Sequence, residues 1–437
     1  MSGTWWQALQ VVKRLWFRAT LYALVAVAIA VLGIVIGPYI PDSFSDMVGA
    51  KAVDAILSII ASSMLAVTTF SLSTLVAATT AAATSGTPRA ISLLLQDRTA
   101  QSALSTFLGA FLFSLVGLIA LNTHLYGGGG RLVLFVATLI VVLLIVTMLL
   151  RWIDHLAGLG QVSETISRVS DTAESALSDL AQSPYLGGLP YTQVPDGALP
   201  LFPDIAGHLR HVDMARLHDI AKGLEGKIFL LARPGDYCSP NEPLLMFHGP
   251  KGFGDEEDDT REATLRAFTL GDIRNYAQDP LFGLTVLSEI ASRALSPGIN
   301  DPGTALDVVS RLSRLMGKFA EQRRTRLAKE ADGDASEARY DTVYMPPVLA
   351  DDLFGAAYVG VARDGAHLIE VASAVQQSLA VVAQAADPEI ADAARDMARQ
   401  ALERSQDAMT YEGDWKKLDA LHASMTSRSH LAHTRQL

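Results

Sequence analysis

The longest apolar stretch of the chain runs from Val53 to Pro88. It carries no charged residue between Asp54 and Arg89, and Pro88 is its first proline. At about 1.5 Å per residue, a helix of this length exceeds the roughly 30 Å hydrocarbon thickness of a bilayer. We therefore expect one continuous helix that crosses the membrane and projects beyond it.

The polar residues of this stretch follow a helical rhythm, with spacings that alternate between four and seven positions. At about 100° per residue, this rhythm places six hydroxyl residues within an arc of roughly 80°. We call this set the hydroxyl stripe: Ser58, Ser62, Thr69, Ser73, Thr80 and Thr84. Two interpretations remain open. Small residues let membrane helices pack closely, with hydroxyls bonded to the preceding turn, or the stripe lines a water-filled path formed by several copies. Five hydroxyl residues lie off the stripe, which weakens the second interpretation: Ser63, Thr68, Ser71, Thr74 and Thr79.

Three further apolar runs are long enough to span a bilayer, at residues 19–40, 103–121 and 132–150. An aromatic and basic segment, residues 1–18, precedes the first run and suits a membrane interface. A cleaved signal peptide is the alternative for this region, but the apolar run is long and no small-residue cleavage site follows it. Basic residues flank the N-terminus, the loop at Arg89 and the end of the last run at Arg151, so the positive-inside rule predicts that both termini are cytoplasmic.

Beyond Arg151 the pattern changes to shorter periodic segments, and we expect a cytoplasmic domain. An amphipathic helix from Gln161 to Ala181 and a Pro- and Gly-rich connector fill residues 152–207. Alternating runs at 208–212, 227–232 and 244–247 predict strands in a small β-sandwich-like unit over residues 208–270. The remaining segments are predicted as a helical subdomain at 271–425, a strand at 341–348, a mobile charged insertion at 323–339 and a disordered tail at 426–437. The predicted fold class is an α-helical integral membrane protein with four transmembrane helices and an α+β cytoplasmic domain that contains a helical bundle.

Composition agrees with this fold class and narrows the function. Half of the 437 residues are hydrophobic and 19% are charged, which indicates an integral membrane protein. The net charge of −11 comes mostly from the second half, and no basic patch with interleaved aromatic residues appears, so nucleic acid is not an expected partner. A single cysteine, Cys238, excludes an intrachain disulfide and fits a reducing compartment.

No metal or cofactor site is expected. The acidic run Asp255–Asp259 lacks the alternating ligands of an EF-hand and is interpreted as a solvated loop. His208 and His211 would lie on opposite faces of a strand, which argues against a zinc site with His218.

Two echoing motifs stand out in the cytoplasmic half, Gln278-Asp279-Pro280 and Asn300-Asp301-Pro302. Aspartate caps the first amides of a helix and proline suits its first position, so both motifs predict helix starts in a capped hairpin. The capped hairpin accounts for Asp279 and Asp301. The polar residues left over are candidates for an inter-subunit salt-bridge network or an anion site: Arg274, Arg293, Asn300 and Asp307.

These two motifs lie in segments that are similar to a known protein family. The segments RALSPGINDPGTALD (residues 293–307), TPRAISLLLQDRTAQSALSTFLGAFLF (87–113) and RNYAQDPLFGL (274–284) resemble a family of predicted bacterial inner-membrane proteins of unknown function. The resemblance implies four N-terminal spans followed by a cytoplasmic domain. It implies no activity.

The expected function is therefore an oligomeric inner-membrane channel or pore for ions or small solutes. The second span would line the path, and the cytoplasmic domain would form a vestibule or regulatory ring. Uncharged spans disfavour an ion-coupled transporter, and an enzyme is not expected because no catalytic motif stands in a convincing context. The expected partners are the lipid bilayer and other copies of the chain. The alternative is a membrane-anchored scaffold or sensor with a ligand- or partner-binding cytoplasmic domain.

Overall fold

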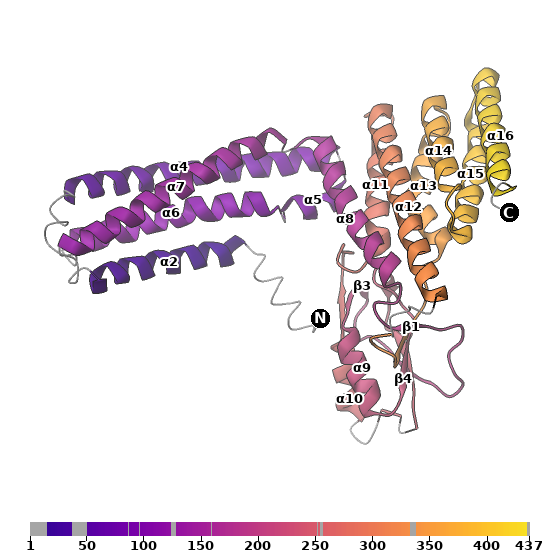
Figure 1. Ribbon diagram of the computed structural model, residues 1–437, viewed down its shortest axis with the longest axis horizontal. Helices are drawn as coiled ribbons and strands as arrows, with labels where there is room; N and C mark the ends of the chain where they lie inside the picture. The colour runs from indigo at the N-terminus through magenta and orange to yellow at the C-terminus, as the bar shows by residue number, and fades with distance from the viewer. Residues whose placement is uncertain are drawn as a thin grey trace. The chain divides into compact units, whose positions relative to one another are not determined.

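A computed structural model describes residues 15–36, 50–85, 87–95, 97–123, 128–158, 160–250, 252–253, 257–332 and 338–434. The chain forms two compact units (Figure 1). We call residues 6–84 and 91–164 the helical unit. The described residues within 85–90 and 165–437 form the second, which we call the α/β unit.

Long apolar helices make up the helical unit. Its members are α2 (Leu15–Ile36), α4 (Ala50–Ser85), α6 (Arg98–Asn122) and α7 (Gly128–Gly158), with the short α5 (Pro88–Leu95) between α4 and α6. Within the described residues, three segments are long and apolar enough to cross a membrane, namely Ala52–Ala81, Thr99–Asn122 and Gly129–Leu156. They correspond to the second, third and fourth predicted spans. The first predicted span overlaps α2, which packs against α6 and α7, and residues 37–40 of that span lie outside the described residues.

One face of α4 is buried by α6 and α7. Val53, Leu57, Ile60 and Met64 recur at helical spacing and join two apolar clusters. Their partners on α6 and α7 are large side chains, among them Phe107, Phe113, Leu134 and Trp152. A Cβ at Gly117 of α6 would lie 3.1 Å from a Leu57 methyl carbon, so the absence of a side chain at Gly117 lets Leu57 pack against the backbone of α6. Burial of this face holds α4 to the rest of the unit.

Two small sheets share one core in the α/β unit. The first has the order β1-β8-β4-β6-β2 and the second the order β5-β3-β7. The strands are β1 (Leu189–Pro190), β2 (Leu199–Leu201), β3 (Gly207–Val212), β4 (Lys227–Leu230), β5 (Tyr237–Cys238), β6 (Leu245–His248), β7 (Phe268–Gly271) and β8 (Val343–Met345). Leu209, Leu217, Ile228 and Phe247 lie in the shared core, together with α9 (Met214–Gly223).

The predicted strands at 208–212, 227–232, 244–247 and 341–348 contain β3, β4, β6 and β8 or overlap them. β8 lies between β1 and β4 and runs parallel to both, whereas the other pairs are antiparallel. The sheets therefore draw on more chain than residues 208–270. They take β1 and β2 from the predicted connector and β8 from the predicted helical subdomain.

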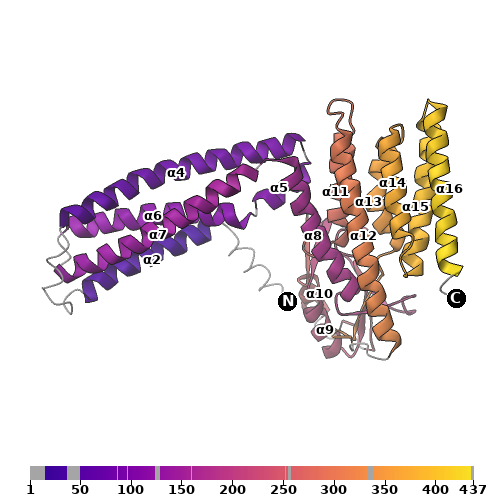
Figure 2. The same ribbon diagram turned by 45° about the horizontal axis from the view of Figure 1, so that its top comes forward.

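Helices complete the α/β unit, and α11 to α16 stand side by side (Figures 1 and 2). They pack mainly as the pairs α11–α13, α12–α14, α14–α15, α11–α12, α13–α15 and α14–α16. The helices are α8 (Val162–Gln182), α10 (Glu257–Leu265), α11 (Pro280–Ala294), α12 (Pro302–Ala331), α13 (Ala350–Asp364), α14 (Ile369–Val382), α15 (Pro388–Ala408) and α16 (Glu412–Thr434). Aspartate side chains cap several helices, and Asp279, Asp301 and Asp387 each precede a proline at the helix start.

Three charged segments differ from their predictions. Glu257, Asp258 and Asp259 form the first turn of α10 instead of a loop, because carboxylates are favourable at a helix N-terminus, while Asp255 lies outside the described residues. α12 continues to Ala331 through most of the predicted mobile insertion, supported by ion pairs such as Arg326–Glu330 along the helix. α16 extends to Thr434, so the predicted disordered tail begins inside a helix.

Candidate functional site

The hydroxyl stripe lies on the face of α4 that its own chain leaves uncovered. Ser58, Ser62, Thr69, Ser73 and Thr80 are all exposed, and the Thr84 side chain lies outside the described residues. At about 100° per residue, the stripe is centred about 180° away from the buried face that begins at Val53. The structure thus settles which way the stripe points: it faces away from α6 and α7.

Several stripe hydroxyls donate hydrogen bonds to carbonyl oxygens of their own helix. Ser62 donates to the Ser58 carbonyl at 3.0 Å, Thr69 to the Leu65 carbonyl at 3.0 Å and Thr80 to the Val76 carbonyl at 2.9 Å. These bonds satisfy the hydroxyl protons while the oxygen lone pairs remain outward. The stripe can therefore tolerate an apolar environment and can also accept hydrogen bonds from water.

Large apolar side chains border the stripe. Ile59 and Phe70 are each 66% exposed, and Leu65, Leu72 and Val76 are about half exposed. Together they make a face of small polar residues with bulky apolar shoulders, a shape that suits contact with lipid or with another helix.

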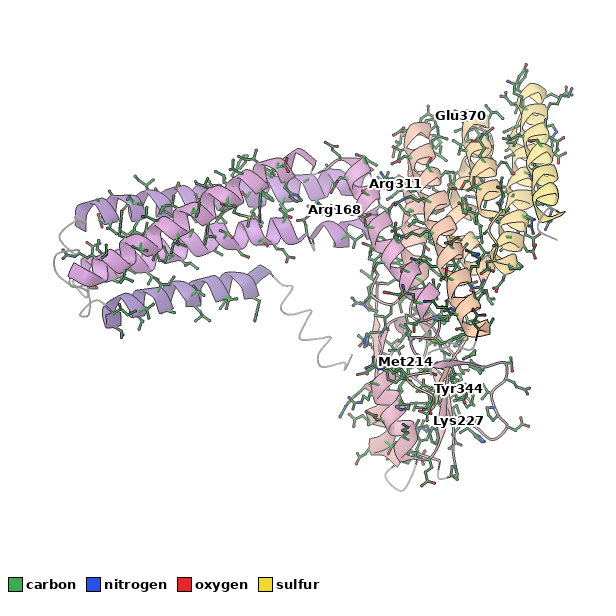
Figure 3. The ribbon with its side chains drawn as sticks, in the orientation of Figure 1. Arg168, Met214, Lys227, Arg311, Tyr344 and Glu370 are labelled. Carbon is green, nitrogen blue, oxygen red and sulfur yellow. The ribbon has the colours of Figure 1, made fainter. Side chains whose placement is uncertain are left out.

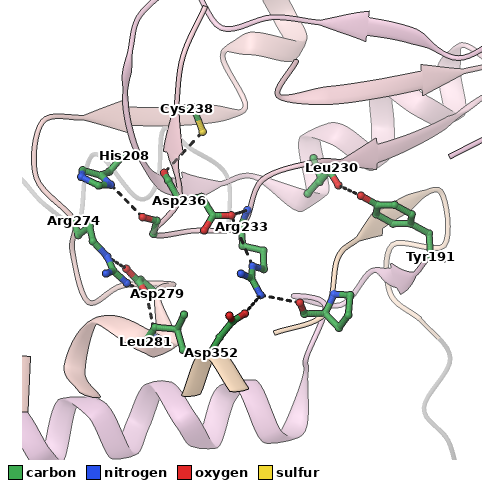
Figure 4. A network of polar contacts seen from close by, with 12 residues as sticks. Tyr191, His208, Leu230, Arg233, Asp236, Cys238, Arg274, Asp279, Leu281 and Asp352 are labelled. Atoms are coloured by element: carbon green, nitrogen blue, oxygen red, sulfur yellow. Dashed lines mark hydrogen bonds and ion pairs between the residues drawn. The ribbon is translucent and has the colours of Figure 1, made fainter. Parts of the chain in front are cut away.

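Asp279 is the centre of the Gln278-Asp279-Pro280 motif. Its carboxylate accepts from Arg274 through two bonds, 2.7 Å from Nε and 2.9 Å from Nη2 (Figure 4). It also accepts from the amides of Leu281 and Phe282 at 3.1 Å each, and only 2% of the residue is exposed. Burial raises the pKa of Asp279, while the Arg274 guanidinium and the two amides oppose that rise. Four hydrogen bonds to the charged form favour an ionised carboxylate that both caps α11 and anchors the preceding loop.

The other predicted motif residues do not converge on this pair. Asp301 caps α12 by accepting from the Thr304 amide at 3.1 Å and from its hydroxyl at 2.6 Å, and these bonds lower the pKa of Asp301. Asn300 lies in the exposed turn with a left-handed φ of 51°. Asp307 pairs with Arg311 one turn along α12 at 3.2 Å, and Arg293 lies in the last turn of α11. Of the six residues, Arg274 and Asp279 bind each other directly.

A second polar cluster was not foreseen from the sequence, and we call it the Glu289 junction: Thr87, Arg89, Tyr276 and Glu289. Glu289 accepts from Arg89 Nη1 at 2.5 Å and from the Thr87 hydroxyl at 3.2 Å. Tyr276 donates to the Arg89 carbonyl at 3.3 Å, and burial, reinforced by the Glu289 charge, raises the pKa of Tyr276. The available signal was that Glu289 is the one acidic residue of α11.

The two clusters are continuous through one aromatic ring. The Phe282 ring lies 4.5 Å from the Tyr276 ring and 5.1 Å from the Arg274 guanidinium, centre to centre. The segment that directly follows α4 is therefore tied to the N-terminal end of α11 by a chain of contacts within the α/β unit.

Replacing Glu289 with alanine is expected to speed hydrogen exchange at the Arg89 and Ala90 amides by up to about fivefold. These amides are held by the Thr87 hydroxyl and carbonyl, and Thr87 is held in turn by Glu289. Because the Arg89–Glu289 pair is partly exposed, its contribution should not exceed about 1 kcal/mol. Mass-spectrometric exchange on the full chain measures this rate. Glu330→Ala, which removes a partner of Arg326 on α12, is the control and should leave these amides unchanged.

Cys238 and the histidines have structural partners. Burial, with smaller contributions from Asp236 and Glu242, raises the pKa of the Cys238 thiol to about 11, so the thiol is unreactive at neutral pH. His208 contacts the Gly235 carbonyl at 3.1 Å and His218 the Thr342 hydroxyl at 2.8 Å. Over the described ranges, no group of three or more His, Cys, Asp or Glu residues is placed to hold a metal ion.

An apolar helical unit with three membrane-length helices, joined to an α/β unit, defines a multi-span membrane protein that contacts the lipid bilayer. The chain belongs to the family described as "Predicted membrane protein (DUF2254)", whose model matches residues 12–381. It is 28% identical over 251 residues to uncharacterized proteins of Mycobacterium bovis and Mycobacterium tuberculosis. That match covers 54% of this chain and 46% of each relative, so the match spans about half the length of either protein. No solved structure matches the chain.

Proposed function

We propose that the protein is a homo-oligomeric channel of the bacterial inner membrane that conducts ions or small solutes. In this proposal α2 is the first of four spans, both termini are cytoplasmic, and the α/β unit forms a vestibule or regulatory ring. Copies of α4 surround the path and present the hydroxyl stripe to it. The proposal assigns no catalytic role to any residue.

The observation that carries the proposal is the direction of the hydroxyl stripe. Its five described members are exposed on the face of α4 opposite the buried residues. In a lone chain this polar face would contact lipid acyl chains. Acyl chains cannot donate hydrogen bonds to the exposed oxygen lone pairs, and small side chains bury little apolar surface against them. When copies assemble around α4, the apolar shoulders meet neighbouring helices and the hydroxyls gather around a common axis, where they can hydrate passing solutes.

A second candidate function is a membrane-anchored scaffold or sensor, and the back-bonded hydroxyls favour it. Because Ser62, Thr69 and Thr80 already donate within α4, the stripe also fits a dry contact between copies. Close packing of small residues would then stabilise the oligomer without any conducting path.

Cysteine substitution along the stripe separates the two functions. The native Cys238 gives little background, since it is buried and its pKa is about 11. In the channel, cysteines at positions 58, 62, 69, 73 and 80 should react with a charged, membrane-impermeant thiosulfonate on the full chain in liposomes. The matched control is Leu143→Cys on α7, where the native side chain is 67% exposed and should face lipid, so this cysteine should remain unmodified.

Conductance gives the second readout. Discrete current steps in planar bilayers that are abolished or altered by Thr69→Lys or Ser73→Lys would support the channel. Stripe cysteines that crosslink between copies under oxidant, stay unmodified by the charged reagent and give silent bilayers would overturn it in favour of the scaffold. A monomer in detergent and in liposomes would contradict both forms of the assembly.

A further inference from the structure

A pocket of about 430 Å³ lies within the α/β unit, next to the Gln278-Asp279-Pro280 motif. Five separate parts of the chain build its walls: the end of α8 with the turn after it, the junction of β3 and α9, the turn at Arg233, the residues leading into α11 and the segment around β8. Its volume falls in the range of pockets that hold small molecules, roughly 300–1,000 Å³. The pocket shares no residue with the hydroxyl stripe or the Glu289 junction.

Most of the pocket wall is apolar and adaptable. Leu180 and Leu186 contribute from α8 and the turn after it, and Met345 and Val348 from the segment around β8. Met214, at the start of α9 (Figure 3), is buried and lines the same pocket. Methionine thioethers adjust to differently shaped apolar groups, so this wall suits an aliphatic or aromatic body.

Two guanidinium groups stand in the remaining wall. Arg233 is held in place by hydrogen bonds from Nη1 to the Pro347 carbonyl at 2.8 Å and to Asp352 at 3.0 Å (Figure 4). Arg339 lies over the Tyr340 ring at 5.4 Å and forms no ion pair with any residue that the structure describes. Asp179 is the acidic residue of this wall. Among the residues that the structure describes, no carboxylate pairs with Arg339, so its guanidinium can donate to a ligand in this pocket.

The motif side of the pocket is rigid. The Gln278 side chain accepts from the Val212 amide at 2.8 Å and donates to the Val212 carbonyl at 3.3 Å, so it is fixed to the last residue of β3. Pro280 follows the doubly anchored Asp279. A preformed wall of this kind lowers the ordering cost of binding.

We infer that this pocket binds a small molecule with an apolar body and one carboxylate. The body would fill the space among the leucine and methionine side chains, and the carboxylate would pair with the Arg339 guanidinium, whose planar fork matches its two oxygens. Arg233 adds positive potential but keeps its bonds to Pro347 and Asp352. The inference does not depend on whether the membrane part conducts.

Binding of 4-phenylbutyrate, a soluble carboxylate of suitable size, is measured by equilibrium dialysis against the full chain in lipid nanodiscs. Saturable binding is expected, and the charge-reversed 4-phenylbutylamine should bind at least tenfold more weakly. Arg339→Glu should weaken phenylbutyrate binding at least tenfold, whereas Arg266→Glu, at an exposed arginine that does not line the pocket, should leave it unchanged.

A second variant pair tests the location. Ala176→Trp places a large ring in the pocket wall and should abolish binding, while Ser175→Trp, one residue away on an exposed side of α8, should not. If Ala176→Trp does not fold, Arg339→Glu decides alone because that side chain is exposed. Absence of saturable binding, equal affinity for the amine, or unchanged affinity in Arg339→Glu would overturn the inference.

Discussion

Replacing Asp279 with alanine is expected to destabilise the α/β unit by about 3–5 kcal/mol, the usual cost of removing one partner from a buried ion pair. The change leaves the Arg274 guanidinium, which is only 23% exposed, without its carboxylate. It also leaves the Leu281 and Phe282 amides without the cap that accepts from them. Hydrogen exchange of the α11 amides in the full chain measures the loss as a rise of two orders of magnitude or more in rate.

Asp301→Ala is the matched control for this prediction. Asp301 also precedes a proline and caps a helix, but it is exposed and its carboxylate accepts from Thr304 and the Gly303 amide instead of from an arginine. Its loss should cost about 1 kcal/mol, as for an ordinary helix cap. Similar exchange rates for the two variants would show that the Arg274 pair adds nothing to the cap.

Replacing Gly235 with alanine is the second change with a large expected effect, about 3 kcal/mol or more. Gly235 has a φ of 104°, and a Cβ there would lie 2.5 Å from Asp279 Oδ2 and 2.7 Å from its Cγ. The substitution therefore adds a backbone strain of about 1–2 kcal/mol to a steric clash with a carboxylate that cannot move without losing its bonds. The midpoint of thermal unfolding of the α/β unit, followed in the full chain, should fall clearly.

Gly197→Ala separates the strain from the clash. Gly197 also has a positive φ, 79°, but no heavy atom lies within 4 Å of the position that its Cβ would take. It should cost only the backbone strain. In addition, Gly235→Ala should cost less in an Asp279→Ala background than in the native protein, since the two residues are in contact and their effects are coupled. Strict additivity would exclude the clash as the cause.

Sequence signals within a few residues of each element were sufficient to predict most of the helices. The Asp-Pro pairs predicted the starts of α11 and α12 at Pro280 and Pro302, because a cap and its proline act within a few residues. Uncharged runs predicted the three membrane-length helices in the same way. Each of these features depends on neighbours that the chain itself places nearby.

Features that depend on distant partners were not predictable. Arg89 and Glu289 are 200 positions apart, and nothing near either residue indicates the other. The hydroxyl stripe shows the same limit. Its arc follows from spacing alone, but both faces of α4 are rich in apolar residues, so only the packing of Leu57 and Met64 against α6 and α7 shows which face is free.

The position of β8 in the first sheet has a consequence for synthesis on the ribosome. β4 pairs with β6, which follows it closely, but its other edge is completed only by β8, more than a hundred residues later. At about 5–20 residues per second, that edge stays open for roughly 5–20 seconds while α11 and α12 are made. An open strand edge invites pairing with other chains, so a nascent chain stalled in this interval is the form of the protein most exposed to aggregation.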